Sequence, residues 1–221
     1  MRKLLKTILI PATLLTVLPA LAQQDPHAER ILKRLSEKTE SYSSLKMDFT
    51  VKVEDKQRGT TDKFGGTVLI KGEKYRLDVF DTKTYFDGEA VYTYLTDVDE
   101  VMISDPEEEE DETDMFSNPA KILRVYEENF KYRMRGEVNL NGKTHYEIDL
   151  HPEEREVEFH TIKLFIDKED TVLHKAVISG KDGSVYTIEI QNIETNMEVS
   201  KEDFTFDPEE HPGVEVIDMR W

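Results

Sequence analysis

A two-residue alternation of apolar and polar side chains is the feature that most constrains how this 221-residue chain folds. Between residues 45 and 53 every second position is leucine, methionine, phenylalanine or valine, and most intervening residues are charged. Successive side chains of a β-strand point to opposite faces, so this pattern predicts a strand with one buried and one solvated face. The same alternation returns at Tyr75, Leu77 and Val79.

Further strands are predicted at intervals of about 8–12 residues, separated by tight turns. We expect them within residues 68–70, 84–86, 90–95, 98–103, 130–136, 143–150, 157–167, 171–179 and 184–192. Asp87-Gly88, Asn141-Gly142 and Asp182-Gly183 are turn signals between neighbouring strands. This spacing indicates an antiparallel meander, closed or nearly closed, and no interior linker or fixed-period repeat divides it into two domains.

Two amphipathic helices accompany the strands. Asp25 is a suitable N-cap and Pro26 a suitable first helical residue, and we expect this helix to end within residues 39–44. An apolar stripe at helical spacing follows the cap: Ala28, Ile31, Leu32 and Leu35. A second helix is predicted after residues 117–119. Helices lying across a curved sheet cover its apolar face, and periodicity alone favours a solid core there over an apolar cavity.

The first 22 residues have the pattern of a secretory signal peptide, with cleavage predicted after Ala22. Arg2, Lys3 and Lys6 precede a mostly apolar stretch at residues 4–18, which is shorter than the roughly 20 residues of a membrane helix. Residues 23–221 then form one exported domain. The chain has no cysteine, which excludes disulfides, thiol nucleophiles and a cysteine-linked lipid anchor.

The charge balance excludes some partners. Aspartate and glutamate number 47 against 29 lysines and arginines, a net charge of −18, which disfavours binding to nucleic acid or to anionic membrane surfaces. The acidic run at residues 107–112 is interpreted as a solvated loop, because it lacks the ligand spacing of a calcium loop. We expect no metal, no cofactor and no catalysis, since no metal-ligand spacing, nucleophile elbow or phosphate-binding glycine loop occurs.

Seven short motifs, in order along the chain, are similar to those of the outer-membrane lipoprotein carrier family, LolA. They lie at residues 43–49, 66–71, 75–77, 87–94, 118–123, 150–152, and 204–208 followed by 212–218. The closing motif, Phe-x-Phe-x-Pro and then Pro-Gly-Val, is the most specific. The resemblance implies an α+β, mainly β fold, in which a single antiparallel unclosed half-barrel covered by a helical lid encloses a hydrophobic cavity.

The resemblance also implies a function. Such a protein is a periplasmic carrier, acting as a monomer, that takes lipoprotein acyl chains from an inner-membrane ABC-type lipoprotein-releasing transporter to an outer-membrane acceptor or membrane. The implied cavity residues, which are ordinary core residues if the core is solid, are Leu45, Met47, Phe49, Val51, Tyr75, Leu77, Val79, Ile122 and Leu123.

One departure from the family concerns the lid. Members commonly carry an arginine after the lysine of the glycine strand, and that arginine is associated with latching the lid. Here Gly72 and Glu73 follow Lys71, so the lid is held by packing alone or the chain belongs to a divergent branch. Two alternatives stay open: a periplasmic lipid-sensing or regulatory module of the same fold, and an enzyme acting on envelope lipid or glycan.

Overall fold

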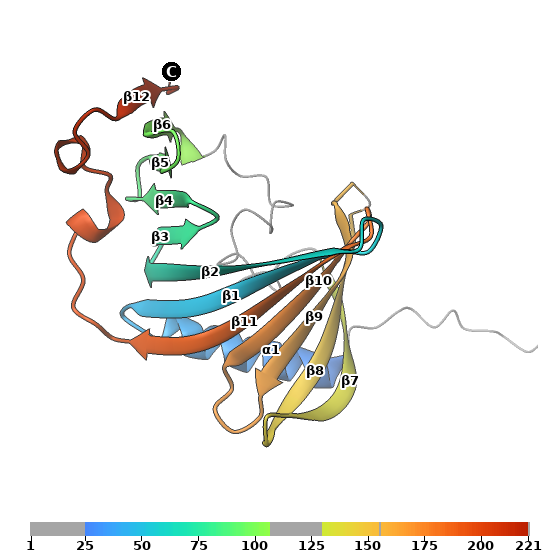
Figure 1. Cartoon of the computed structure of the whole chain (residues 1–221). Coiled ribbons are helices and arrows are strands. Elements are labelled where there is room, and N and C mark those ends of the chain that lie inside the picture. Colours follow the sequence, from blue (N-terminus) through green and yellow to red (C-terminus); the bar gives the residue numbers. More distant parts are fainter. Residues whose placement is uncertain (1–24, 107–129, 155, 221) are drawn as a thin grey trace, which may run out of the picture.

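The computed structural model describes residues 25–106, 130–154 and 156–220, which form one 12-stranded sheet with one α-helix packed against it (Figure 1). The predicted signal peptide, the acidic run and the predicted second helix lie outside the described residues. The first strands are β1 Leu45–Asp55, β2 Thr60–Lys71, β3 Lys74–Val79, β4 Thr82–Phe86, β5 Val91–Leu95 and β6 Glu100–Ser104. The others are β7 Phe130–Leu140, β8 Lys143–Pro152, β9 Phe159–Asp167, β10 Leu173–Gly180, β11 Ser184–Thr195 and β12 Glu215–Asp218.

The strand order is β12-β6-β5-β4-β3-β2-β1-β11-β10-β9-β8-β7, so the sheet is unclosed, with β12 and β7 at its edges. The meander prediction holds within β1–β6 and within β7–β11, where neighbours along the chain pair antiparallel. The two meanders are joined by the antiparallel pair β1–β11, and β12 pairs parallel with β6. The sheet is therefore not a single meander, because alternation specifies strands and their faces but not distant partners.

The helix α1, Pro26–Glu40, follows its sequence signals closely. Asp25 is its N-cap, and the Asp25 carboxylate accepts hydrogen bonds from the backbone N–H of His27 at 2.9 Å and of Ala28 at 3.4 Å. The predicted stripe is buried at Ala28, Ile31, Leu32 and Leu35. The predicted cap, first residue and apolar side of this helix are all confirmed.

One face of the sheet, here called the helix face, packs against α1. It carries Met47 and Phe49 of β1, Leu77 and Val79 of β3, and the buried aliphatic residues of β8–β11. Gly66 of β2 lies opposite Phe49, whose ring occupies the space above that glycine: a Cβ there would be 2.6 Å from the ring. The register thus places the smallest residue beneath the largest side chain of β1.

The other side of the sheet, here called the second face, has a separate core at β4–β6. Tyr85, Tyr94 and Val101 are buried there with Phe206. Phe206 belongs to the C-terminal segment, residues 201–214, which contains the 3₁₀ turns η3 Glu202–Phe204 and η4 Pro208–Glu210. Figure 1 shows this segment running past β3–β6 before β12 joins β6. Val98, expected in a strand, lies in the β5–β6 turn and is 59% exposed.

Candidate functional site

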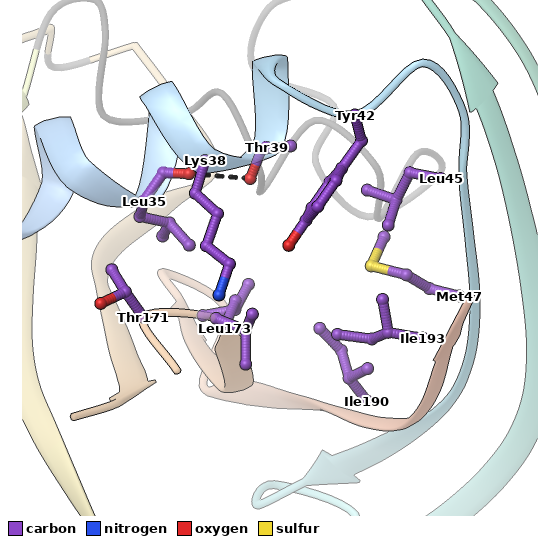
Figure 2. Close-up of a pocket in the computed structure, with 11 residues that line it drawn as sticks. Leu35, Lys38, Thr39, Tyr42, Leu45, Met47, Thr171, Leu173, Ile190 and Ile193 are labelled. Carbon is purple, nitrogen blue, oxygen red and sulfur yellow. Dashed lines mark hydrogen bonds between the residues drawn. The ribbon is translucent and has the colours of Figure 1, made fainter. Parts of the chain in front are cut away.

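A pocket opens between the C-terminal end of α1 and the helix face of the sheet (Figure 2). The helix side contributes Leu35, Lys38, Thr39 and the following Tyr42. The sheet side contributes Leu45, Met47, Thr171, Val172, Leu173, Ile190 and Ile193. The walls are mainly aliphatic, so the pocket is suited to an apolar group rather than to a hydrated one.

A β-bulge in β11 shapes one wall of this pocket. Neighbouring residues of β1, Asp48 and Phe49, pair with residues 192 and 190, so Gln191 is the extra residue. Ile190 and Ile193 therefore both reach the helix face, although a regular strand would direct them to opposite faces.

A second bulge, in β10, shapes the neighbouring wall. Leu173 pairs with Ile166 and Lys175 with Phe165, which leaves His174 as the extra residue. The pairing of β10 with β11 extends only as far as Lys175, so Leu173 lies where these two strands separate. The pocket thus occupies the gap between two diverging strands, with the end of α1 above it.

The enclosed space is small, with a volume of about 20 Å³. A cavity needs at least about 10–15 Å³ on this scale to hold one water molecule, so the space holds roughly one water. An alkyl chain enters only if the side chains or the helix around it move. Met47 is suited to such movement, because methionine is unbranched and flexible.

Polar contacts hold both ends of α1 to the sheet. At its start, the Asp25 carboxylate accepts a hydrogen bond from the backbone N–H of Met134 in β7 at 3.0 Å. Backbone hydrogen bonds from His27 and Met134 are the main reason that the pKa of Asp25 is lowered. Near its end, Arg34 donates to the hydroxyl of Thr171 at 3.0 Å and Lys38 donates to the carbonyl of Asp170.

The β9–β10 turn that receives Arg34 and Lys38 is itself organised by Asp167. The Asp167 carboxylate accepts hydrogen bonds from the backbone N–H of Glu169 at 2.8 Å and of Asp170 at 2.9 Å. Burial raises the pKa of Asp167, but these two hydrogen bonds and the nearby Lys143 ammonium outweigh burial and lower it. Asp167 thus stays ionised and fixes the turn beneath the end of the helix.

The predicted cavity residues fall into three groups. Leu45 and Met47 line the pocket, and Phe49, Val51, Leu77 and Val79 lie deeper in the core under α1. Tyr75 is half-buried at the margin of that core, with its ring 5.6 Å from the ring of Phe86. Ile122 and Leu123 lie outside the described residues. That any of these residues contacts an acyl chain stays a prediction.

Of the eleven residues that line the pocket, sequence reasoning selected only Leu45 and Met47. The residues it missed include Lys38, Tyr42, Leu173, Ile190 and Ile193. The last three come from strands far along the chain whose bulges break the two-residue period. Tyr42 follows the helix and belongs to no periodic pattern, although its place just before the 43–49 motif was a usable signal.

No cluster of three or more histidine, aspartate or glutamate side chains among the described residues is arranged to hold a metal ion. None of their helices combines the length and apolarity needed to cross a membrane.

Fold and pocket together define a protein with one unclosed sheet whose apolar face lies under an amphipathic helix. The chain belongs to the family described as outer membrane lipoprotein carrier protein LolA, which it matches over residues 40–207. The family assignment and the unclosed sheet predicted from the sequence motifs are both confirmed.

Comparison with individual proteins extends this result. An uncharacterized protein of Methanocaldococcus jannaschii is 26% identical over 200 residues, which cover 85% of this chain and 53% of that protein. The chain thus spans about half the length of that relative. An uncharacterized conserved protein from Thermus thermophilus has a TM-score of 0.59 at 14% identity, covering 87% of this chain and 99% of the other. A DUF1329 family protein from Desulfovibrio piger has a TM-score of 0.50 at 13% identity, covering 81% and 96%. At these identities the two structures support the fold alone.

Proposed function

We propose that this chain is a periplasmic carrier that binds the acyl chains of lipoproteins and ferries lipoproteins from the inner to the outer membrane. The observation that carries the proposal is the apolar helix face of an unclosed sheet, covered by α1, with a pocket at the end of that helix. Membership of the LolA family supports the same conclusion.

The energetics of lipid transfer favour such a device. A triacylated lipoprotein exposes on the order of 40 methylenes, each worth about 0.8 kcal/mol when buried, so its release into water costs on the order of 30 kcal/mol. A carrier lowers this cost by offering an apolar wall. Reversible affinities saturate near about −18 to −21 kcal/mol, so the carrier does not extract its cargo unaided. The proposal therefore includes an inner-membrane ABC-type transporter as donor and an outer-membrane acceptor or membrane as sink.

In this proposal α1 is the movable cover. The pocket of about 20 Å³ has room for roughly one water, so acyl chains enter as α1 moves away from the sheet. The aliphatic stripe Ile31, Leu32 and Leu35 leaves the helix face, and acyl methylenes take its place against Met47 and its neighbours. Exchanging one apolar contact for another keeps the net cost of opening low. The proposal assigns no catalytic step to the chain; a screen with ester and glycoside substrates tests this, and turnover would contradict it.

The first experiment measures lipoprotein release. Purified protein is added to spheroplasts of the source organism, and the supernatant is examined by native mass spectrometry. A one-to-one complex with a lipoprotein that keeps its acyl chains is the expected result. Recovery of empty protein contradicts the carrier function; if the empty protein still binds acyl compounds in solution, the sensing or regulatory alternative replaces it.

A second experiment needs no variant. Binding of synthetic lipopeptides that differ only in acyl length is measured by titration with the wild-type protein. Each added methylene is expected to tighten binding by about fourfold, corresponding to about 0.8 kcal/mol, until the site is filled. An affinity independent of chain length would exclude burial of the acyl chains.

A matched pair of substitutions locates the binding face. Met47→Asp places a charge on the helix face at the pocket, whereas Lys46→Asp places one at the neighbouring position, whose side chain points to the second face. We expect Met47→Asp to abolish transfer and Lys46→Asp to leave it unchanged. Circular dichroism establishes that both variants are folded, and normal transfer by folded Met47→Asp protein would contradict this assignment.

A further inference from the structure

Four polar side chains, Lys38, Thr39, Tyr42 and Thr171, stand among the apolar walls of the pocket, and the two threonine hydroxyls are hydrogen-bonded to Leu35 and Arg34. In Figure 2 the Lys38 amine and the Tyr42 hydroxyl both point from the end of α1 and the residues after it into the space above Leu173 and Ile190. Both side chains are half-buried. A purely hydrocarbon ligand uses neither group, so their placement indicates a ligand with a polar head.

No carboxylate of the described residues matches the charge of Lys38. Within the described residues its only polar partner is the carbonyl oxygen of Asp170, and no carboxylate lies within 4.0 Å of its ammonium. The Asp170 carboxylate is instead 3.6 Å from the ammonium of Lys143. Lys33 on the same helix differs, because it pairs with Glu37 at 3.8 Å.

A second cation lies one helical turn earlier. Arg34 donates to the hydroxyl of Thr171, and within the described residues no carboxylate lies within ion-pair distance of its guanidinium. Residues i and i+4 of a helix are neighbours on its surface, so the exposed Arg34 side chain lies beside Lys38, although Arg34 itself does not line the pocket. The Asp167 and Asp170 carboxylates of the neighbouring turn lie within 3.6 Å of the Lys143 ammonium instead.

The Tyr42 hydroxyl adds a hydrogen-bond donor directed into the same space. It makes no hydrogen bond to another described residue, whereas Tyr94 donates to Asp99 at 2.9 Å and Tyr92 to Asp87 at 3.3 Å. The Lys38 ammonium and the Tyr42 hydroxyl, with Arg34 beside them, stand above aliphatic walls and are complementary to an anionic head attached to an alkyl chain.

We infer that the pocket at the end of α1 binds a single-chain anionic amphiphile, whose head pairs with Lys38 and Arg34 while its alkyl chain lies against Met47, Ile190 and Ile193. The head is a carboxylate or a phosphate monoester, because both offer acceptor oxygens to these donors. The inference rests on the proposed function in that the alkyl chain uses the same helix face, and it adds a preference for a charged head.

The test compares ligands that share a chain but differ in charge. Palmitate, lysophosphatidic acid with a palmitoyl chain, and methyl palmitate each displace a fluorescent fatty acid from the wild-type protein. We expect the charged ligands to bind at least tenfold more tightly than the methyl ester, and added salt to reduce that difference. The ratio of the two charged ligands distinguishes a carboxylate from a phosphate as the preferred head.

Variants test the assignment of the cations. Lys38→Gln and Arg34→Gln are each expected to weaken palmitate binding about five- to twentyfold and to change methyl ester binding much less, so that the preference for the charged ligand falls. Lys33→Gln is the matched control, since Lys33 lies on the same helix with its side chain 73% exposed, and it should change neither affinity. Tyr42→Phe should weaken palmitate binding by a few-fold.

The outcomes separate this inference from the function it extends. Equal binding of palmitate and its methyl ester, or a charge preference that survives both Lys38→Gln and Arg34→Gln, overturns the anionic-head assignment and leaves acyl-chain binding in place. Failure of all three ligands to bind contradicts the proposed acyl-chain function as well.

Discussion

The two ends of the sheet are covered on opposite faces and by different kinds of side chain. Under α1, the helix face is mainly aliphatic, and Ile31, Leu32 and Leu35 lie over similar side chains of β8–β11. At β4–β6 the second face is aromatic: the ring of Phe206 lies 5.1 Å from that of Tyr94 and 4.8 Å from that of His211. Aliphatic layers tolerate rearrangement, whereas aromatic pairs have preferred geometries.

This difference indicates that one region is built to open and the other to hold the C-terminal segment in place. The aliphatic region has a pocket, a helix held at its ends by hydrogen bonds, and two strands that diverge. The aromatic region fixes the C-terminal segment and through it the edge strand β12. We therefore expect α1 to move away from the sheet more readily than the C-terminal segment does. If so, the two regions unfold independently of each other.

Removing the Phe206 ring has the largest expected effect. Phe206→Ala should destabilise the protein by about 3–5 kcal/mol, because it leaves a cavity between Tyr85 and Tyr94. Hydrogen exchange should speed up first in β5, β6 and β12. Leu32→Ala is the counterpart under α1, expected to cost about 2–5 kcal/mol and to speed exchange in α1 first.

Exposed Val98 supplies the control for this pair, since Val98→Ala should change the free energy of unfolding by less than about 0.5 kcal/mol. If Phe206→Ala and Leu32→Ala accelerate exchange equally in every strand, the sheet opens as one unit and the division into two regions is wrong.

A paired glycine substitution probes the packing under α1. Gly66→Ala places a methyl group 2.6 Å from the Phe49 ring and 3.0 Å from the Asp78 carbonyl, and should cost about 1–3 kcal/mol. Gly65→Ala meets nothing within 4 Å and should stabilise the strand by up to about 0.5–1 kcal/mol. Urea unfolding of both variants measures the difference; a loss at Gly65 as large as that at Gly66 would rule out the steric explanation.

The sequence predicted the parts of these regions that depend on local pattern. The Asp25 cap, the apolar stripe of α1 and the alternation of β1 all follow from nearest neighbours along the chain. The edge position of β12 was not predicted, because its residues are exposed on both faces and carry no periodic signal.

The pocket could not be predicted from local pattern, because it depends on which distant strands pair with each other. Ile190 reaches it through a bulge, and Leu173 reaches it where pairing between two strands ends. The bulge arises where β1 pairs with β11, at Asp48 and Asn192, which are 144 residues apart in the sequence. Propensity and periodicity describe one strand at a time, so neither identifies a site assembled from such partners.

Acid should loosen the start of α1. The pKa of Asp25 is lowered by hydrogen bonds from His27 and Met134, so its carboxylate stabilises the folded state above the ordinary value of about 3.9. This contribution is lost as the pH falls through the lower folded-state pKa. Asp25→Ala should cost about 0.5–2 kcal/mol at neutral pH and remove this part of the pH dependence.

Asp25→Asn separates capping from charge, because asparagine caps a helix as well as aspartate but does not titrate. Its stability at neutral pH should lie between those of the wild-type and Asp25→Ala proteins, because the asparagine oxygen still caps the helix but its amide nitrogen does not accept from the Met134 N–H. Its acid-dependent loss of stability should be smaller than that of the wild-type protein. Denaturant unfolding at several pH values measures both quantities. An unchanged pH profile in Asp25→Asn protein would show that other carboxylates account for the acid sensitivity.

The smallest effect is expected at the β3–β4 turn, where the two regions meet. Phe80 and Asp81 both have left-handed backbones, with φ of 54° and 60°, a conformation that glycine adopts without strain. The Asp81 carbonyl accepts hydrogen bonds from Thr96, and these survive a change of side chain. Asp81→Gly should therefore raise the free energy of unfolding by roughly 0.5 kcal/mol. The relief of backbone strain in the folded state exceeds the cost of the greater conformational freedom that glycine gives to the unfolded chain.

Phe80→Gly relieves the same strain but should lower stability, because the Phe80 ring lies 4.7 Å from the ring of Phe64. An aromatic pair of this kind contributes about 0.5–1.5 kcal/mol beyond the area it buries. Thermal unfolding of the two variants therefore compares two effects at neighbouring residues with similar φ. At Asp81 only backbone strain is removed, whereas at Phe80 the ring contact with Phe64 is lost as well. A gain in thermal stability in both variants would mean that the ring contact does not stabilise the turn. The turn would then be held by strand pairing and by the hydrogen bonds from Thr96 alone.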